Sequence, residues 1–460
     1  MDHTEDTIVA LATPAGTGAI GVIRLSGPDA IAIANKVFKG KDLAKQESHT
    51  IHFGQIADGE VVLDEVLVSL FIAPRSYTRE NVVEISCHAS NYIIESIIKL
   101  LIRNGAVAAK PGEFTLRAFL NGALDLSQAE AVADLIASNS KASQQVAMQQ
   151  LRGGFSSQLQ LLREQLVQFA SLVELELDFS EEDVEFANRG QLKQLIADIL
   201  KVIAQLIQSF ELGNAIKQGV NTVIAGRPNA GKSTLLNALL NEDRAIVSHI
   251  PGTTRDTIEE VLNINGINFR LIDTAGIREA TDTIEQIGVQ RTMEKISQSA
   301  LLIYVYDAAE TTADELNSDL EKLQKPGITM LVVANKIDLL NADGEQSTKS
   351  EIRNPKSEII QVSAKQKQHI DELKDRIYSS AIKSELTGSE TLVTNVRHVE
   401  ALQKTQEALV RLLTGIDTQV TSDFLAMDIK QALHYLGEIT GAVTTDDLLD
   451  NIFSKFCIGK

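Results

Sequence analysis

The chain has 460 residues, which at roughly 100–200 residues per domain predicts about three domains. It carries 43 Lys and Arg against 62 Asp and Glu, and this net charge of −19 disfavours a protein that holds nucleic acid on a broad basic face. With 44% hydrophobic and 23% charged residues, the composition is that of a folded chain. No apolar run reaches the ~18 residues of a membrane-spanning helix, the first residues are acidic where a signal peptide is basic, and Cys87 and Cys457 are the only cysteines. We therefore expect a cytoplasmic protein without membrane association.

The negative charge is unevenly distributed. Residues 121–215 have a net charge of −7, and residues 174–185 hold seven acidic side chains without one basic side chain. This acidic cluster is either a solvated helix end or loop, or a docking surface for a basic partner. Composition leaves both interpretations open.

The first 120 residues predict an α/β domain. Strands are expected at five places: 7–12, 19–25, 51–57, 65–73 and 82–86. Asp58-Gly59 between the third and fourth of these is typical of a hairpin turn. Helices are expected at 28–38 and 91–103.

Two helical stretches then flank a second α/β pattern. The first stretch, 121–215, carries apolar residues at spacings of 4, 3, 4, 3 and 4: Phe155, Leu159, Leu162, Leu166, Phe169 and Val173. The second, 384–460, places Leu425, Ile429, Leu433 and Leu436 on one helix face, and Thr444-Thr445-Asp446-Asp447 predicts the N-cap of a last helix.

Between them, apolar strands at 220–225, 269–273, 301–307, 330–334 and 359–362 alternate with helices, which predicts a parallel sheet. We therefore predict four segments: 1–120, 121–215, 216–383 as an α/β domain, and 384–460, with the α/β domain inserted into one helical domain.

A phosphate-binding loop begins the inserted domain. Residues 226–233 read GRPNAGKS, which fits GxxxxGK[ST], follows the strand at 220–225 and precedes a helix at 234–240. The glycines let backbone N–H groups close around a β-phosphate, Lys232 offers a positive charge to the β and γ oxygens, and Ser233 offers a hydroxyl to Mg²⁺.

Four further motifs follow in order. Residues 252–256 read GTTRD, and their Thr254 is placed to complete a metal shell. Residues 273–276 read DTAG, in which the Asp holds the metal through water and the Gly N–H senses the γ-phosphate. Residues 335–338 read NKID, whose carboxylate accepts two hydrogen bonds that guanine donates and adenine does not, and 363–365 read SAK beside the guanine carbonyl. Together they predict a GTP-binding domain.

The hydrolysis apparatus departs from the Ras pattern. Ile277 follows DTAG where a water-orienting Gln is usual, and an apolar side chain does not replace it. Another group must orient the water and another cation must neutralise the transition state. Asn229 is a candidate ligand for a monovalent cation, and Glu285 is either the water-orienting carboxylate or a solvated helix charge.

These motifs, with PGEFTLRAFLNG at 111–122 and the terminal FCIGK at 456–460, resemble the MnmE (TrmE) family of tRNA uridine modification GTPases over the whole chain. The resemblance implies a multidomain α/β + α fold. Its parts are an N-terminal folate-binding α/β domain similar to the aminomethyltransferase of glycine cleavage, a discontinuous helical domain, and an inserted Ras-like P-loop G domain.

The resemblance also implies cofactors and partners. The cofactors are GTP, Mg²⁺, K⁺ and 5-formyltetrahydrofolate or a related tetrahydrofolate derivative. The partners are a second copy of the chain bound through the N-terminal domain, tRNA, and the flavin-using MnmG (GidA) in a heterotetramer or larger complex. With MnmG, the family adds an aminomethyl-type (carboxymethylaminomethyl) group to carbon 5 of the wobble uridine.

The site residues carried over by motif position fall into three groups. Residues implied to contact GTP are Asn229, Ala230, Gly231, Lys232, Ser233, Thr234, Ser248, His249, Ile250, Pro251, Gly252, Thr253, Thr254, Asp273, Thr274, Ala275, Gly276, Asn335, Lys336, Ile337, Asp338, Ser363, Ala364 and Lys365. Asn229, Ser248, Ile250 and Thr253 are implied to surround K⁺, and Ser233 and Thr254 to hold Mg²⁺. Glu285 is implied to orient the water and, with Lys232, to act in hydrolysis.

Folate is implied to meet Arg24, Glu84, Lys460 and the position of Ala123. The family commonly has Lys at position 123, so the alanine removes a charge there. Cys457 is either a buried inert thiol or an auxiliary chemical group beside the folate-borne carbon. His88 is expected to be structural, since no metal-type His and Cys spacing accompanies it.

Two other classes compete. A ribosome-associated GTPase of the Era or Der type carries a basic RNA-binding module, whereas none of the four segments here is net basic. A membrane-linked GTPase is disfavoured by the missing spanning and lipidation signals, since the terminal Lys460 fits a prenylation motif poorly.

Overall fold

The computed structural model describes residues 6–178, 189–240, 259–273, 299–324, 328–340, 359–381, 391–418 and 420–459. The chain divides into two compact units. The first comprises Met1–Ile136, Met148–Leu200 and Ala401–Lys460, and the second comprises Ala137–Ala147 and Lys201–Glu400. The predicted domain boundaries at 121, 216 and 384 stay a prediction.

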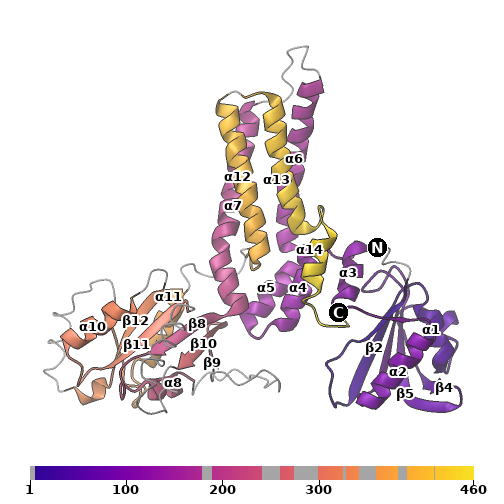
Figure 1. Ribbon diagram of the computed structural model, residues 1–460, viewed down its shortest axis with the longest axis horizontal. Coiled ribbons are helices and arrows are strands. Elements are labelled where there is room, and N and C mark those ends of the chain that lie inside the picture. The colour runs from indigo at the N-terminus through magenta and orange to yellow at the C-terminus, as the bar shows by residue number, and fades with distance from the viewer. Residues whose placement is uncertain are drawn as a thin grey trace. The chain divides into compact units, whose positions relative to one another are not determined.

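The N-terminal part of the first unit is a seven-stranded sheet in the order β3-β4-β5-β6-β2-β1-β7 (Figure 1). Its strands are β1 (Ile8–Leu11), β2 (Ile20–Ser26), β3 (Phe38–Lys39), β4 (Thr50–Asp58), β5 (Val61–Phe71), β6 (Val82–His88) and β7 (Val107–Ala108). Helices α1 (Ala30–Val37) and α2 (Asn91–Arg103) bury their apolar sides against it, Ile33 and Ile97 among them. The predicted hairpin at Asp58-Gly59 is confirmed, because β4 and β5 pair as antiparallel neighbours around it.

Helices make up the rest of the first unit. They are α3 (Glu113–Leu120), α4 (Leu126–Ala137), α5 (Lys141–Leu151), α6 (Gly154–Asp178), α7 (Arg189–Gln218), α12 (Val396–Asp417), α13 (Ser422–Thr440) and α14 (Asp446–Phe453), some of which continue into the second unit. Helices α6 and α13 lie side by side, although about 250 residues separate them in the chain. Leu159 and Leu166 of the predicted stripe on α6 are buried, as are Leu425 and Ile429 on α13. The side chain of Thr445 caps α14 by accepting from Leu448 N, as predicted.

The second unit contains a six-stranded sheet in the order β13-β12-β11-β8-β10-β9. The strands are β8 (Val220–Ala225), β9 (Glu259–Ile264), β10 (Ile267–Asp273), β11 (Leu301–Asp307), β12 (Thr329–Asn335) and β13 (Ile359–Gln361). The five predicted strands, which correspond to β8, β10, β11, β12 and β13, are parallel as predicted. The sequence prediction missed β9, which pairs antiparallel with β10 because the turn at Asn265-Gly266 joins them directly.

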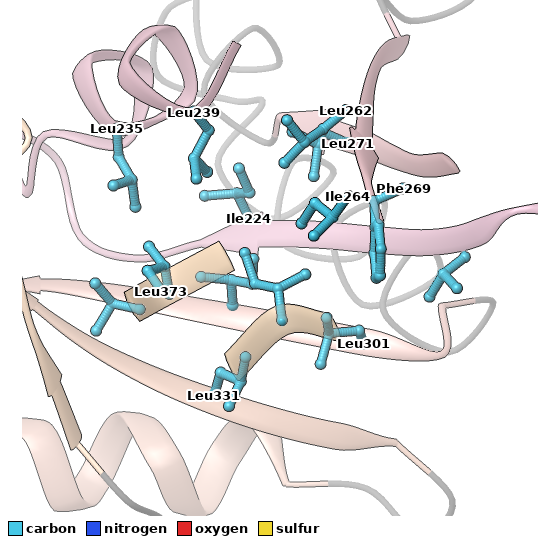
Figure 2. Packing of buried hydrophobic residues seen from close by; sticks show 14 of the residues in the cluster. Ile224, Leu235, Leu239, Leu262, Ile264, Phe269, Leu271, Leu301, Leu331 and Leu373 are labelled. Carbon is cyan, nitrogen blue, oxygen red and sulfur yellow. The ribbon is translucent and has the colours of Figure 1, made fainter. Parts of the chain in front are cut away.

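Both faces of this sheet are covered, as expected for parallel strands buried on two sides. On one face, α8 (Lys232–Leu240) and α11 (Ile370–Ala381) pack Leu235, Leu239 and Leu373 against the strands, as Figure 2 shows. On the other, α10 (Ala313–Leu323) packs Leu316 and Leu320 against Tyr304 and Tyr306 of β11. The carboxyl ends of the parallel strands therefore lie at one edge of a sheet that is packed on both faces.

A short segment from far upstream also belongs to the second unit. Ala142 and Val146 pack against the core of the inserted domain. Asn268 of β10 donates through Nδ2 to Asn139 Oδ1, 2.7 Å away, and accepts from Asn263 Nδ2 of β9 at 2.7 Å. The β9–β10 hairpin is therefore tied to residues that precede α5.

Among the residues that the structure describes, no helix is long and apolar enough to cross a membrane.

Candidate functional site

The phosphate loop lies between β8 and α8. A Cβ at Gly231, where φ is +87°, would stand 2.3 Å from Asn335 Nδ2, and a Cβ at Gly226 would stand 2.0 Å from the carbonyl oxygen of Val305. Asn229 adopts φ 63°, a left-handed conformation that Asn tolerates better than most residues. Lys232 is buried and donates through Nζ to the carbonyl oxygens of Gly226, at 2.9 Å, and Arg227, at 2.8 Å. The two glycines therefore let the loop pack directly on Val305 and Asn335, where a side chain would clash. This close packing, the buried Lys232 and the helix that begins at Lys232 fit a phosphate-binding loop.

The base-recognition loops meet the phosphate loop through one side chain. Asn335, at the end of β12, donates through Nδ2 to the carbonyl oxygen of Ala230 at 2.9 Å and accepts from Ala364 N at 3.0 Å. Asp338 accepts through Oδ1 from Ser363 Oγ at 2.6 Å, which orients its carboxylate. The structure therefore brings together three of the five predicted motifs, from three separate loops.

Two residues near this site were missed by the sequence prediction. Asp307, which ends β11 and is buried, accepts from Lys336 Nζ at 2.7 Å and from Ala309 N at 2.9 Å, and so fixes the lysine of NKID. Arg227 of the phosphate loop reaches Glu315 and Asp319 on α10. An Asp at the end of a buried strand was the available signal for the first, and a charged residue inside the glycine-rich loop for the second.

The metal and hydrolysis residues are only partly described. Ser233 and Thr234 lie exposed in the first turn of α8, and Asp273 is the last residue of β10. Outside the described residues lie Ser248, His249, Ile250, Pro251, Gly252, Thr253, Thr254, Thr274, Ala275, Gly276 and Glu285. Asn229 is thus the one predicted K⁺ ligand whose position the structure describes.

A second polar cluster lies in the N-terminal sheet. Arg24 on β2 and Glu84 on β6 are cross-strand neighbours, and Nε and Nη2 of Arg24 each lie 2.8 Å from Glu84 Oε1. The guanidinium lies 5.7 Å from the ring centres of both Tyr77 and Phe114, within the range of cation–π attraction. Burial raises the pKa of Tyr77, whose hydroxyl lies 2.9 Å from Thr115 Oγ1. The ion pair keeps about a quarter of its side-chain surface exposed, so it remains accessible to a ligand.

The last residues of the chain return to this cluster. Arg24 Nη1 lies 3.5 Å from the carbonyl oxygen of Gly459, and Gly112 N donates to the carbonyl oxygen of Cys457 at 3.3 Å. A Cβ at Gly459, where φ is +91°, would stand 2.0 Å from the carbonyl oxygen of Leu11. The tail therefore packs directly on β1. Lys460 itself lies outside the described residues.

Ala123 lies just beyond α3, where its N–H donates to the carbonyl oxygen of Ala118 at 2.8 Å. Arg79 Nη1 donates to the carbonyl oxygen of Asn121 at 3.0 Å, so a cation lies beside this turn. Among the described residues, no hydrogen bond joins Ala123 to Arg24 or Glu84, and its place in a ligand site stays a prediction.

Both cysteines and His88 have definite environments. Cys457 is exposed, so its interpretation as a buried thiol is wrong: the tail covers β1 with Gly459 and leaves this side chain in solvent. Cys87 is the buried one, and burial raises its pKa to about 11, which leaves it unreactive near neutral pH. His88 pairs with Asp64 at 2.7 Å, and the described residues contain no group of three or more His, Cys, Asp or Glu that could hold a metal ion.

The acidic cluster is described only at its first residues. Glu174 forms an ion pair with Lys430 of α13 at 2.8 Å. Glu181, Glu182, Asp183 and Glu185 lie outside the described residues. Both interpretations of the cluster stay open.

Comparison with known proteins assigns the chain to a family. The profile of the MnmE helical domain matches residues 126–457, and that of the GTP-binding protein TrmE N-terminus matches residues 7–123. The chain belongs to the MnmE (TrmE) family. The tRNA modification GTPase MnmE of Cytophaga hutchinsonii is 59% identical over 459 residues, covering 100% of this chain and 98% of that protein. That of Flavobacterium psychrophilum is 54% identical over 462 residues, covering 99% of each.

Among solved structures, an Aquifex aeolicus Era variant bound to GDP and aluminium fluoride matches with 29% identity and a TM-score of 0.30, covering 42% of this chain and 67% of that one.

The predictions of the MnmE family and of its fold class are confirmed: an N-terminal α/β domain, a discontinuous helical domain and an inserted Ras-like G domain.

We expect Gly231→Ala to abolish GTP binding, a loss of at least ~100-fold in affinity, because the new methyl group clashes with Asn335 and needs a left-handed backbone. Equilibrium titration with a fluorescent GDP analogue measures this. The matched control is Gly59→Ala, which has a similar φ of +65° but no atom within 4 Å, and should bind normally. Wild-type affinity in the Gly231 variant would contradict this account of the loop.

Proposed function

We propose that this chain is a K⁺-dependent GTP hydrolase of the cytoplasm. With a flavin-dependent MnmG-type partner and a tetrahydrofolate one-carbon donor, it adds a carboxymethylaminomethyl-type group to carbon 5 of the wobble uridine of certain tRNAs. The proposal is carried by one observation: a phosphate cradle and a separate Arg–Glu cluster closed by the chain's own tail occur on a single chain that belongs throughout to the MnmE family.

The nucleotide site carries the hydrolysis. GTP supplies the bond that is cleaved, and Mg²⁺ neutralises charge on its phosphates. Lys232 is buried at the loop, and Ser233 in the first turn of α8 is proposed to bind the metal. Asp338, which accepts a hydrogen bond from Ser363, is proposed to recognise the guanine edge. Glu285 is proposed to orient the attacking water, with Thr254 as the second Mg²⁺ ligand.

The N-terminal cluster suits a reduced folate. Glu84 accepts hydrogen bonds from an amino-substituted ring, and Arg24 pairs with a carboxylate or a ring oxygen. Tyr77 and Phe114 add aromatic surface beside the guanidinium. The tail brings Cys457, whose thiol is exposed, to the same region, which supports its proposed contact with the ligand. Lys460, the next residue after Gly459 in the sequence, is proposed to bind the same ligand.

A partner must supply many of the contacts that bind the tRNA phosphate backbone. The chain has a net charge of −19, and affinity for a phosphate backbone comes from clustered Lys and Arg. We propose that MnmG provides that basic surface, in a heterotetramer or larger complex with this protein.

A homodimer through the N-terminal sheet is supported by an exposed apolar face. On β4, His52, Gly54 and Ile56 are buried on one face, whereas Ile51 and Phe53 are 66% and 68% exposed on the other. Leu67, the cross-strand neighbour of Phe53, is 46% exposed. A contiguous apolar strip of this kind marks a protein interface, and a second copy of the same face matches it in hydrophobicity.

We expect the protein to bind 5-formyltetrahydrofolate in isothermal titration, and Arg24→Ala or Glu84→Ala to lower the affinity at least ~10-fold, since each removes a charge-assisted hydrogen bond. Arg103→Ala, which breaks the exposed Arg103–Asp58 ion pair of the same domain, is the control and should bind normally. Absence of binding, or equal affinity of the wild type and the Arg24 and Glu84 variants, would refute the folate proposal. The full reaction is followed by the mass of the wobble nucleoside in tRNA incubated with both proteins.

We expect GTP turnover to be at least ~10-fold faster in KCl than in NaCl, because a cation of the right size must neutralise the transition state where no arginine does. Asn229→Gly keeps the left-handed backbone, removes the amide oxygen, and should abolish the difference between the salts. Steady-state phosphate release measures both. Equal rates in the two salts for the wild type would refute the K⁺ assignment.

We expect the wild type to sediment as a dimer and Phe53→Asp to shift it to monomer at micromolar concentration, because a charge buried in an apolar interface is costly. Ile102→Asp on α2, a 40% exposed position on the opposite, helix-covered side of the sheet, is the matched control and should remain dimeric. A dimeric Phe53→Asp variant would remove this face from the interface.

A further inference from the structure

Arg227, the second residue of the phosphate loop, turns its side chain away from the loop and towards α10. Its Nε donates to Asp319 Oδ2 at 2.7 Å, Nη2 lies 3.4 Å from Asp319 Oδ1, and Nη1 donates to Glu315 Oε1. All three guanidinium nitrogens are thus engaged by two carboxylates on successive turns of one helix. The fork of Arg and the planar carboxylate of Asp319 match in a bidentate pair, which fixes direction as well as distance.

The two carboxylates are themselves fixed by other elements. Asp319 Oδ2 also accepts from the hydroxyl of Tyr304 on β11 at 2.6 Å. Glu315 closes the capping box of α10, accepting through Oε2 from Thr312 N at 3.1 Å. Leu316 and Leu320 bury the same helix against the sheet. Arg227 is therefore attached to a rigid support formed by α10 and β11.

The ionisation states of Arg227, Asp319 and Tyr304 agree with this geometry. Burial and the hydrogen bond to Asp319 raise the pKa of Tyr304, which keeps its proton as the donor. Although burial opposes it, hydrogen bonds from Arg227 and Tyr304 lower the pKa of Asp319. Asp319 is therefore a carboxylate, and Arg227 a cation, throughout the physiological range.

The backbone of Arg227 belongs to the nucleotide site. Its carbonyl oxygen accepts from Lys232 Nζ at 2.8 Å, and two residues further on Asn229 holds the left-handed conformation that shapes the loop. A loop that must present its N–H groups to phosphate binds more tightly when it is held in that shape beforehand. When only a fraction of molecules holds the competent shape, the apparent dissociation constant rises by the inverse of that fraction.

We propose that Arg227 is a positioning residue of the nucleotide site, which anchors the first half of the phosphate loop to α10 through Asp319 and Glu315, and that it is not the cation that stabilises the transition state. This inference rests on the GTP binding and hydrolysis of the proposed function. It adds α10, a helix that carries none of the recognised nucleotide motifs, to the elements that set nucleotide affinity.

The test separates affinity from turnover. We expect Arg227→Gln and Asp319→Asn each to raise the dissociation constant for GDP about 5- to 20-fold, mostly through faster release. The dissociation constant of the double variant should not exceed that of the single variant with the lower affinity, because both substitutions remove the same interaction. Phosphate release at saturating GTP should stay within about twofold of wild type. Arg227→Lys, which retains one contact, should recover part of the affinity. Stopped-flow release of a fluorescent GDP analogue and steady-state assays in KCl provide both readouts.

Matched variants keep the outcome unambiguous. The control for Asp319→Asn is Asp428→Asn, which breaks the Arg411–Asp428 pair between α12 and α13. It should leave nucleotide affinity unchanged. Tyr304→Phe removes only the hydroxyl that binds Asp319, and we expect it to raise the dissociation constant for GDP by a smaller factor. This variant tests the anchor if the other variants fold poorly.

Two results overturn the proposal. A fall in turnover of ~10³-fold or more in Arg227→Gln with unchanged affinity would make Arg227 a transition-state cation. Unchanged affinity in all the Arg227, Asp319 and Tyr304 variants would show that the anchor has no effect on the site. Failure of the wild type to bind GTP, in contrast, would refute the proposed function itself.

Discussion

The nucleotide site depends on the buried side-chain amide of Asn335. Its exposed fraction is 2%, and its two polar atoms are satisfied by Ala230 of the phosphate loop and Ala364 of the SAK loop. Because an unpaired buried polar group costs on the order of 1–3 kcal/mol, the two loops are held at one separation. The same amide occupies the space that a side chain at position 231 would need. One residue thus links phosphate recognition, base recognition and the requirement for glycine.

A similar constraint closes the N-terminal cluster. Gly459 packs so closely on β1 that no side chain fits, and its carbonyl oxygen lies beside Arg24. The tail reaches this position from α14, whose Phe453 packs with Leu126 of α4. The cluster is therefore completed by residues that come from opposite ends of the chain, and its geometry depends on the packing of the helices that carry the tail.

Local patterns predicted most of the fold. Asn91–Arg103 and Val220–Ala225 form a helix and a strand at the predicted limits, because helical periodicity and a buried β-rich run are properties of the segment itself. The missed strands are of another kind. β3 and β7 have two residues each, and β9 begins with Glu259-Glu260 at the edge of its sheet, so their sequences lack the apolar run that marks a strand. Pairing with a neighbouring strand, which the sequence does not encode locally, gives them their conformation.

The sequence by itself determined the nucleotide motifs, the parallel strands that carry them, the Thr445 cap and the buried stripe of α6, because each depends on residues within a few positions of one another. Tertiary structure alone decided what the polar side chains do. Arg227 pairs with Asp319, 92 residues away in the sequence, and Arg24 pairs with Glu84, 60 residues away. Gly459 of the tail lies beside Arg24 across 435 residues of sequence, whereas Cys457 is exposed to solvent. Such contacts follow from the packing of sheets and helices, since a charged side chain carries no local signal of the partner that the fold brings to it.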